Sequence, residues 1–128
     1  MAIDNAADLA TALKVLRSEI GKKDIPAHWV EFLLMVAAAG PKGVTTKEVA
    51  DCIGMSQGIS SRTVRVLSRY PDAESRKQMG YDMLVTVPDY EYRHRQRVFL
   101  SAKGEHIFKK LDRYFKVVDP LPSSDAFQ

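Results

Sequence analysis

Residues 45–70 constrain the fold of this chain more than any other stretch. The segment opens with a capping-box pattern, in which Thr45 stands three residues before Glu48 and just ahead of an apolar repeat at helical spacing. A glycine then permits a sharp turn, and Ser56 can cap a second helix, which we expect over about residues 57–69. Two short helices joined by a tight turn indicate a helix-turn-helix over residues 45–70.

The second of these helices has an unusual charge. It contains three arginines and no acidic residue, although the chain as a whole has 19 Lys and Arg against 16 Asp and Glu. We expect Ile59, Thr63, Val66 and Leu67 to face inward. The residues then left outside are Gln57, Ser60, Ser61, Arg62, Arg65 and Arg69. Short polar side chains with arginines behind them are typical of a helix that enters a DNA major groove, and a solvated basic face is the alternative.

A second group of arginines follows in a predicted hairpin. Residues 81–87 and 97–100 are rich in β-forming side chains, and we expect them to pair within a hairpin over residues 81–101. Arg93, Arg95 and Arg97 lie in and beside the connecting segment. A basic hairpin after a helix-turn-helix is typical of the wing of a winged helix, whose arginines can lie along phosphates or in a narrow minor groove.

Amphipathic helices are expected at both ends of this unit. Apolar residues recur at helical spacing over residues 5–20 and again over about 103–116, and an apolar run over 26–39 predicts a core helix that contains Trp29. A terminal apolar stripe packs either into its own domain or against a second copy, and the pattern alone leaves both open. The fold class is thus mainly α with a small β-hairpin.

Length and cysteine content limit the domain organisation and the compartment. A chain of 128 residues fits one domain, which we place at residues 1–118, with a Pro- and Ser-containing flexible tail at 119–128. Cys52 is the single cysteine, so an internal disulfide is excluded, and we expect a small buried side chain in a reducing compartment. The N-terminus lacks a secretion signal, and no apolar run could span a bilayer, which predicts a cytoplasmic protein without a membrane partner.

Sequence patterns for catalysis or for metal binding were not found. His28, His94 and His106 are scattered, and Cys52 has no other metal-binding residue type at ligand spacing. The glycines around Pro41 lack the rest of a phosphate-binding loop. We therefore predict no enzymatic activity, no cofactor and no metal.

Two short motifs resemble those of MarR-type winged-helix transcription regulators. Residues 50–57, ADCIGMSQ, resemble the A-x-x-L-G-L-S-Q core of that family, and residues 100–104, LSAKG, resemble its L-[ST]-x-x-G. The order of elements agrees over about residues 25–115. The resemblance implies that a wing arginine reaches the neighbouring minor groove, and that base edges and phosphates are approached by Ser56, Gln57, Ser60, Ser61 and Arg62.

The same resemblance implies a dimer. Family members dimerise through their terminal helices, and the corresponding residues here are Leu9, Leu13, Leu16, Ile20, Ile107, Leu111 and Phe115. The chain departs from the family in three places. The nearest match to the acidic-x-Arg element of the wing, residues 91–93, lies one residue too far from the closing glycine; the loop 71–80 is longer than usual; and one C-terminal helix replaces two. No small-molecule effector is indicated.

The leading hypothesis is a sequence-specific double-stranded DNA-binding transcription regulator that acts as a homodimeric repressor. One alternative is a winged-helix adaptor module, in which the arginines form a solvated face or bind an acidic protein. Another is a DNA-binding replication or partition factor of a mobile element. On the leading hypothesis, Arg62→Ala should relax base preference, whereas Arg93→Ala should weaken binding to most sequences alike.

Overall fold

Helices and strands follow one another in the predicted order. The computed structural model describes residues 3–72, 74–92 and 94–114. The elements are α1 (Ile3–Ile20), α2 (Ala27–Ala39), the 3-10 turn η1 (Gly40–Lys42), β1 (Val44–Thr45), α3 (Thr46–Ile53), α4 (Gln57–Leu67), β2 (Tyr70–Pro71), β3 (Gln78–Met79), β4 (Leu84–Pro88), β5 (Gln96–Leu100), α5 (Ala102–Leu111) and η2 (Asp112–Tyr114). The predicted tail at 119–128 lies outside the described residues.

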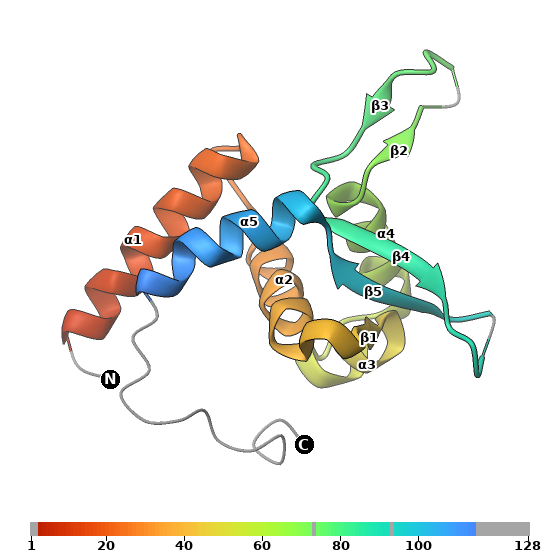
Figure 1. The fold of residues 1–128 in the computed structure, drawn as a ribbon, viewed down its shortest axis with the longest axis horizontal. Helices are drawn as coiled ribbons and strands as arrows, with labels where there is room; N and C mark the ends of the chain where they lie inside the picture. Colours follow the sequence, from red (N-terminus) through yellow and green to blue (C-terminus); the bar gives the residue numbers. More distant parts are fainter. Residues whose placement is uncertain (1–2, 73, 93, 115–128) are drawn as a thin grey trace.

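The strands form the wing and tie it to the helix-turn-helix. β5 is the middle strand of an antiparallel sheet in the order β1-β5-β4, with Val98 paired to both Val44 and Thr86. β1 was not predicted, and it joins the start of α3 directly to the root of the wing. Figure 1 shows α1 and α5 side by side at one end of the molecule, with the sheet and α4 at the other. This arrangement is a winged helix-turn-helix and confirms the predicted fold class.

The core lies where α2 meets the helix-turn-helix, the sheet and the terminal helices. Its largest fully buried side chains are Phe32, Leu33, Val36, Val49, Leu67, Met83, Leu84, Val98, Ile107 and Leu111. Trp29, predicted to be core, packs half-buried at the edge, with its ring tilted against Tyr81. Burial of this apolar set, at about 25 cal/mol per Å², is the main force that holds the helices against the sheet.

The terminal helices pack against each other within one protomer. Leu16 and Ile20 of α1, and Ile107 and Leu111 of α5, are buried in the core. Lys110 donates a hydrogen bond to Glu19 at 2.9 Å across the same contact, and this bond lowers the pKa of the Glu19 carboxyl. The apolar stripes therefore serve the protomer's own core first, and among the predicted dimer residues Leu9 and Leu13 stay half-exposed. Phe115 lies outside the described residues.

Several local predictions were wrong. Helix α4 ends at Leu67 and not at Arg69, because Ser68 is extended, with a ψ of 168°. Cys52 is exposed on α3 and is not a buried core residue. Ile59 was expected to face inward but is exposed on α4. Each error followed from helical periodicity, which gives the spacing of a face without saying where that face ends.

The predicted loop over residues 71–80 contains structure of its own. β2 and β3 pair antiparallel, with Tyr70 opposite Met79, and form a second hairpin that extends beyond the end of α4 (Figure 1). No helix of the described residues is long and apolar enough to cross a membrane.

Candidate nucleic-acid interface

The helix-turn-helix is built by caps that the sequence encodes locally. The Thr45 hydroxyl accepts a hydrogen bond from the Glu48 amide at 3.1 Å and donates one to the Glu48 carboxylate, also at 3.1 Å. Gly54 ends α3 in the left-handed conformation, with a φ of 71°. The Ser56 hydroxyl then accepts from the Ile59 amide at 3.2 Å and starts α4. Each such cap contributes about 1 kcal/mol, so the turn and the direction of α4 are well determined.

One face of α4 is free for a partner. Gln57, Ser61, Arg62 and Arg65 are exposed along it, Ser56 is exposed at its start, and Arg69 is exposed just beyond its end. The uncharged side chains lie toward the N-terminal tip and the arginines toward the other end. This order offers hydrogen-bonding groups at the tip and positive charge behind them, as the sequence predicted.

Ser60 does not belong to this face. Its side chain is 0% exposed, and its hydroxyl donates a hydrogen bond to the Thr46 carbonyl of α3 at 3.2 Å. The prediction that it approaches DNA was therefore wrong, because Ser60 lies at the close crossing of α3 and α4. Its small polar side chain joins the two helices and fixes the angle at which α4 is presented.

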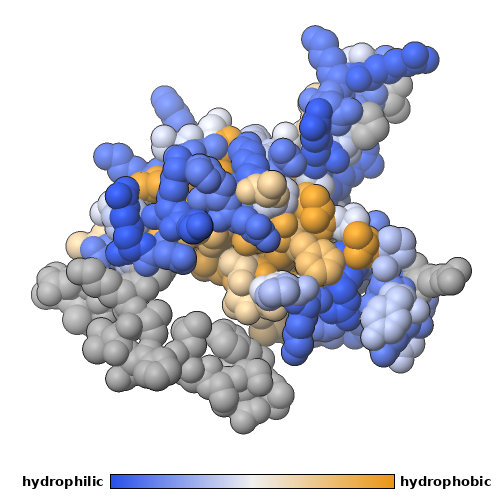
Figure 2. All heavy atoms as spheres, in the orientation of Figure 1, coloured by the Kyte–Doolittle hydropathy of each residue, from blue (hydrophilic) through white to orange (hydrophobic). Residues whose placement is uncertain are grey.

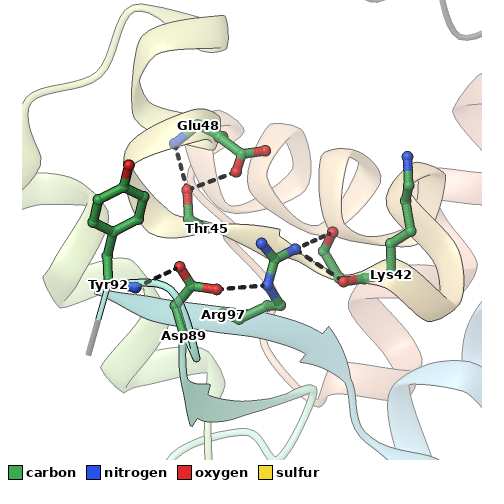
Figure 3. A network of polar contacts seen from close by, with 7 residues as sticks. Lys42, Thr45, Glu48, Asp89, Tyr92 and Arg97 are labelled. Atoms are coloured by element: carbon green, nitrogen blue, oxygen red, sulfur yellow. Dashed lines mark hydrogen bonds and ion pairs between the residues drawn. The ribbon is translucent and has the colours of Figure 1, made fainter. Parts of the chain in front are cut away.

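The wing is held by a polar network around a buried carboxylate (Figure 3). Asp89, which directly follows β4, is 3% exposed and accepts hydrogen bonds from the Tyr92 amide at 3.2 Å and from Arg97 Nε at 3.2 Å. Arg97 Nη1 donates to the Lys42 carbonyl at 3.0 Å and to the Gly43 carbonyl at 3.4 Å. The network thus connects the wing with the turn before the helix-turn-helix.

The three wing arginines have different roles in this geometry. Arg97 was predicted to contact DNA, but its guanidinium is turned inward to Asp89 and the two carbonyls, and its side chain is 27% exposed. Arg95 lies over the Tyr92 ring, 4.5 Å from its centroid, near the wing tip. Arg93 lies outside the described residues. Arg97 is therefore a brace, and Arg95 is the wing arginine placed toward a partner.

Asp89 is the residue that sequence analysis missed. Pro88-Asp89 marks the end of a strand in the sequence, but its partner Arg97 stands eight residues later on the paired strand. The strand register brings the two together: Pro88 is opposite Gln96, and Val87 is opposite Arg97. A register prediction for this hairpin would have been the available signal. Among the described residues, no three His, Cys, Asp or Glu side chains gather as a metal site requires.

Solved structures with the same fold are MarR-type transcriptional regulators. A mutant of MepR from S. aureus, bound to an oligodeoxyribonucleotide, matches with a TM-score of 0.60 and 17% identity over 86% of this chain and 69% of that one. A MarR transcriptional regulator from Methanosarcina mazei Go1 matches with a TM-score of 0.56 and 15% identity, over 86% and 70% of the two chains. MarR itself matches with a TM-score of 0.55 and 21% identity, over 86% and 71%.

These likenesses show a MarR-like winged-helix fold, as the sequence motifs predicted, in a group of regulators and not of enzymes. No family model matches the chain. No curated protein matches its sequence either. Function is therefore argued from this chain's own residues.

Proposed function

We propose that this chain is a sequence-specific double-stranded DNA-binding transcription regulator that acts as a homodimeric repressor. The observation that carries the proposal is the exposed polar and basic face of α4, presented by a capped helix-turn-helix of MarR-like fold. The MepR match supports it, because that protein is bound to an oligodeoxyribonucleotide in its structure.

The residues of α4 divide the work of recognition. An arginine can form a bidentate pair with guanine, worth about 1–3 kcal/mol of discrimination, and Arg62 is placed for this role behind the helix tip. Gln57 and Ser61 would read neighbouring base edges, and Ser56 would donate to a phosphate at the tip. Arg65 and Arg69, further along, would neutralise phosphates and would give affinity without sequence preference.

The wing supplies the second contact. Its register is fixed by the sheet and by the Asp89 to Arg97 brace, so its tip is held at one position relative to α4. Arg95, together with Arg93, would lie along the backbone or in the narrow minor groove beside the major-groove contact. Because α4 and the wing are parts of one rigid unit, a binding site must match both.

A second copy would dock on an apolar groove of about 380 Å³ between α1, α2 and α5. Leu9, Leu13 and Leu34 line it, and each is at least partly exposed. Its lining also includes one cation, Arg17, and one anion, Glu31. A two-fold axis through such a face would place each of these charges near its opposite on the other copy, as an isologous interface requires. This groove replaces the buried residues of α1 and α5 as the proposed interface.

Repression would follow from occupancy. A two-fold dimer presents two α4 helices to one side of the duplex and selects an inverted repeat with half-sites about one helical turn apart. A protein that occupies such a site within a promoter prevents polymerase from binding there.

Selection of bound duplexes from a random pool tests the proposal. We expect an inverted repeat to emerge, and the affinity for it to fall steeply with salt because arginine-phosphate contacts release counterions. Arg62→Ala should relax the base preference, whereas Arg93→Ala or Arg95→Ala should weaken binding to all duplexes alike. Lys14→Ala, an exposed lysine on α1, is the control for charge alone. If no duplex binds at low salt, the DNA-binding function is lost and an adaptor module takes its place.

The dimer has a separate test. Leu13→Glu puts a charge into the apolar groove and should convert the protein to a monomer in sedimentation velocity, whereas Glu31→Asp keeps the charge and should leave the dimer intact. A wild-type chain that sediments as a monomer at micromolar concentration, and stays monomeric on the selected duplex, would refute the homodimer without affecting DNA binding by α4.

A further inference from the structure

We propose that the β2–β3 hairpin is a second DNA-contacting arm, which binds the phosphate backbone beyond the C-terminal end of α4. The proposal rests on the proposed function and adds a contact surface to it. In Figure 1 the β2–β3 hairpin and the wing both project from the end of the molecule that holds α4, away from α1 and α5. A duplex lying along α4 would therefore meet a hairpin on two sides of that helix.

The root of the hairpin is fixed to the last turn of α4. The chain leaving β3 donates hydrogen bonds from the Tyr81 amide to the Val66 carbonyl at 3.0 Å and from the Met83 amide to the Leu67 carbonyl at 2.7 Å. Gly80 lies so close to the Ser68 carbonyl that a Cβ at this position would overlap it. Both stems of the hairpin thus emerge at the helix end, and its direction is set by α4.

The tip of the hairpin is ordered by a local turn. The Asp72 amide donates to the Lys77 carbonyl at 2.8 Å, and the Arg76 amide donates to the Asp72 carbonyl at 3.0 Å. The Asp72 carboxylate accepts from the amide and the hydroxyl of Ser75, at 3.0 and 2.8 Å. Because the turn engages this carboxylate, the adjacent cations Arg76 and Lys77 are presented on a formed surface and not on a floppy loop.

The cations of the hairpin continue those of α4. Arg62 and Arg65 are exposed on the helix, Arg69 is exposed at the junction, and Arg76 and Lys77 are exposed on the hairpin. Arg65 also lies over the ring of Tyr70, the first residue of β2, at 4.7 Å from the ring centroid, and so couples the helix face to the hairpin. A row of cations with this extent suits an extended polyanion such as a phosphate backbone.

The composition of the hairpin favours nucleic acid over a protein partner. Stable protein interfaces have a buried centre of aromatic and apolar anchors. Among the described side chains of residues 69–79, Met79 is the large apolar one that is well exposed, whereas Tyr70 is half-buried beneath Arg65. Figure 2 shows this projection as mostly hydrophilic, in contrast to the apolar side chains in the middle of the same view.

The double variant Arg76→Ala/Lys77→Ala tests the arm on duplexes selected by the wild-type protein. Each lost phosphate contact should reduce the slope of log affinity against log salt by about 0.9, so two contacts reduce it by about 1.8. Between about 50 and 200 mM salt, the wild type should then lose about tenfold more affinity than the variant does. The weakening at low salt should be the same for specific and unrelated duplexes, because phosphate contacts carry no sequence information.

A matched control and a footprint separate the arm from a general charge effect. Lys14→Ala/Lys23→Ala removes two exposed charges from α1 and the segment after it, and should leave the salt slope unchanged. Hydroxyl-radical footprinting should show protection of the backbone beside the α4 half-site that the hairpin variant loses. Arg76→Gln/Lys77→Gln, which keeps the stems of the side chains, should behave as the alanine pair does.

The outcomes distinguish this proposal from the one it rests on. If the wild type binds duplexes and the hairpin variants keep both its slope and its footprint, the arm is refuted, DNA binding by α4 stands, and a protein partner becomes the occupant of the hairpin. If the wild type binds no duplex, both proposals fail. The thermal unfolding midpoint of each variant should match that of the wild type, since the substituted side chains are exposed.

Discussion

The two hairpins of this molecule present similar charges on different supports. The wing pairs β4 with β5 over five positions, and β5 pairs again with β1, so the hairpin is part of the central sheet. The second hairpin pairs β2 with β3 over two positions and has no third strand in the described structure. An isolated two-stranded ladder is at best marginally stable, so the second hairpin must depend on its ends and its turn.

The difference teaches how a fold can add a contact without rebuilding its core. The wing tip is placed by tertiary contacts, above all by Arg97, which spans Asp89 and the carbonyls of Lys42 and Gly43. The β2–β3 hairpin is placed by Gly80 and by backbone hydrogen bonds to the end of α4, and its tip is shaped by Asp72. The wing should therefore respond to distant substitutions, and the second hairpin to local ones at its root.

The largest effect is expected for Gly80→Ala at the root of the second hairpin. Gly80 has a φ of 86°, which L residues rarely adopt, and a Cβ would overlap the Ser68 carbonyl. Strain of this kind together with overpacking costs about 3 kcal/mol. Urea unfolding should show this loss, whereas Gly58→Ala, on α4 with no atom within 4 Å of the added Cβ, should not destabilise. An unchanged Gly80→Ala protein would mean that the root is not fixed to α4.

Asp89→Ala should give the next largest loss, in the wing. It leaves the Tyr92 amide and the Arg97 guanidinium without the carboxylate they share, which costs about 2 kcal/mol for a buried, charge-assisted group. Asp51→Ala, whose carboxylate pairs with Lys47 on the surface of α3, removes an exposed ion pair and should cost no more than about 0.5 kcal/mol. Chemical denaturation of both variants measures the difference, and equal losses would contradict the role of Asp89 as a brace.

A smaller, local effect is expected for Asp72→Ala at the tip of the second hairpin. The loss of its hydrogen bonds with Ser75 should loosen the turn by about 1 kcal/mol without changing global stability. Trypsin should then cut after Arg76 or Lys77 faster than in the wild type. Glu74→Ala changes the neighbouring charge and should leave the cleavage rate unaltered. A lower global stability for Asp72→Ala would show that the two hairpins are coupled after all.

The smallest effect is expected for Ser68→Ala, between α4 and β2. The Ser68 hydroxyl is buried and has no hydrogen-bond partner within the described residues, whereas its carbonyl lies against Gly80. Removing the hydroxyl should change stability by less than about 0.5 kcal/mol. Ser60→Ala, which breaks the bond to the Thr46 carbonyl, should cost about 1 kcal/mol in the same unfolding experiment. A large loss for Ser68→Ala would reveal a partner for that hydroxyl.

The sequence by itself determined the local elements and the residues that begin and end them. Thr45 with Glu48, then Gly54 and Ser56, specify the turn between α3 and α4 through contacts no more than a few residues apart. Periodic apolar residues likewise specify α1, α2 and α5. Such signals are readable because caps and helical faces depend on neighbours in the chain.

Tertiary structure decided which polar residues face a partner and which hold the fold together. Ser60 and Arg97 have the residue types of DNA contacts, yet Ser60 is taken by the Thr46 carbonyl and Arg97 by a carbonyl 55 residues away. The two residues of β1 become a strand because β5 lies beside them. These outcomes depend on partners brought near by the packing of α2, α3 and the sheet, and a hydrogen bond between distant segments leaves no periodic pattern in the sequence.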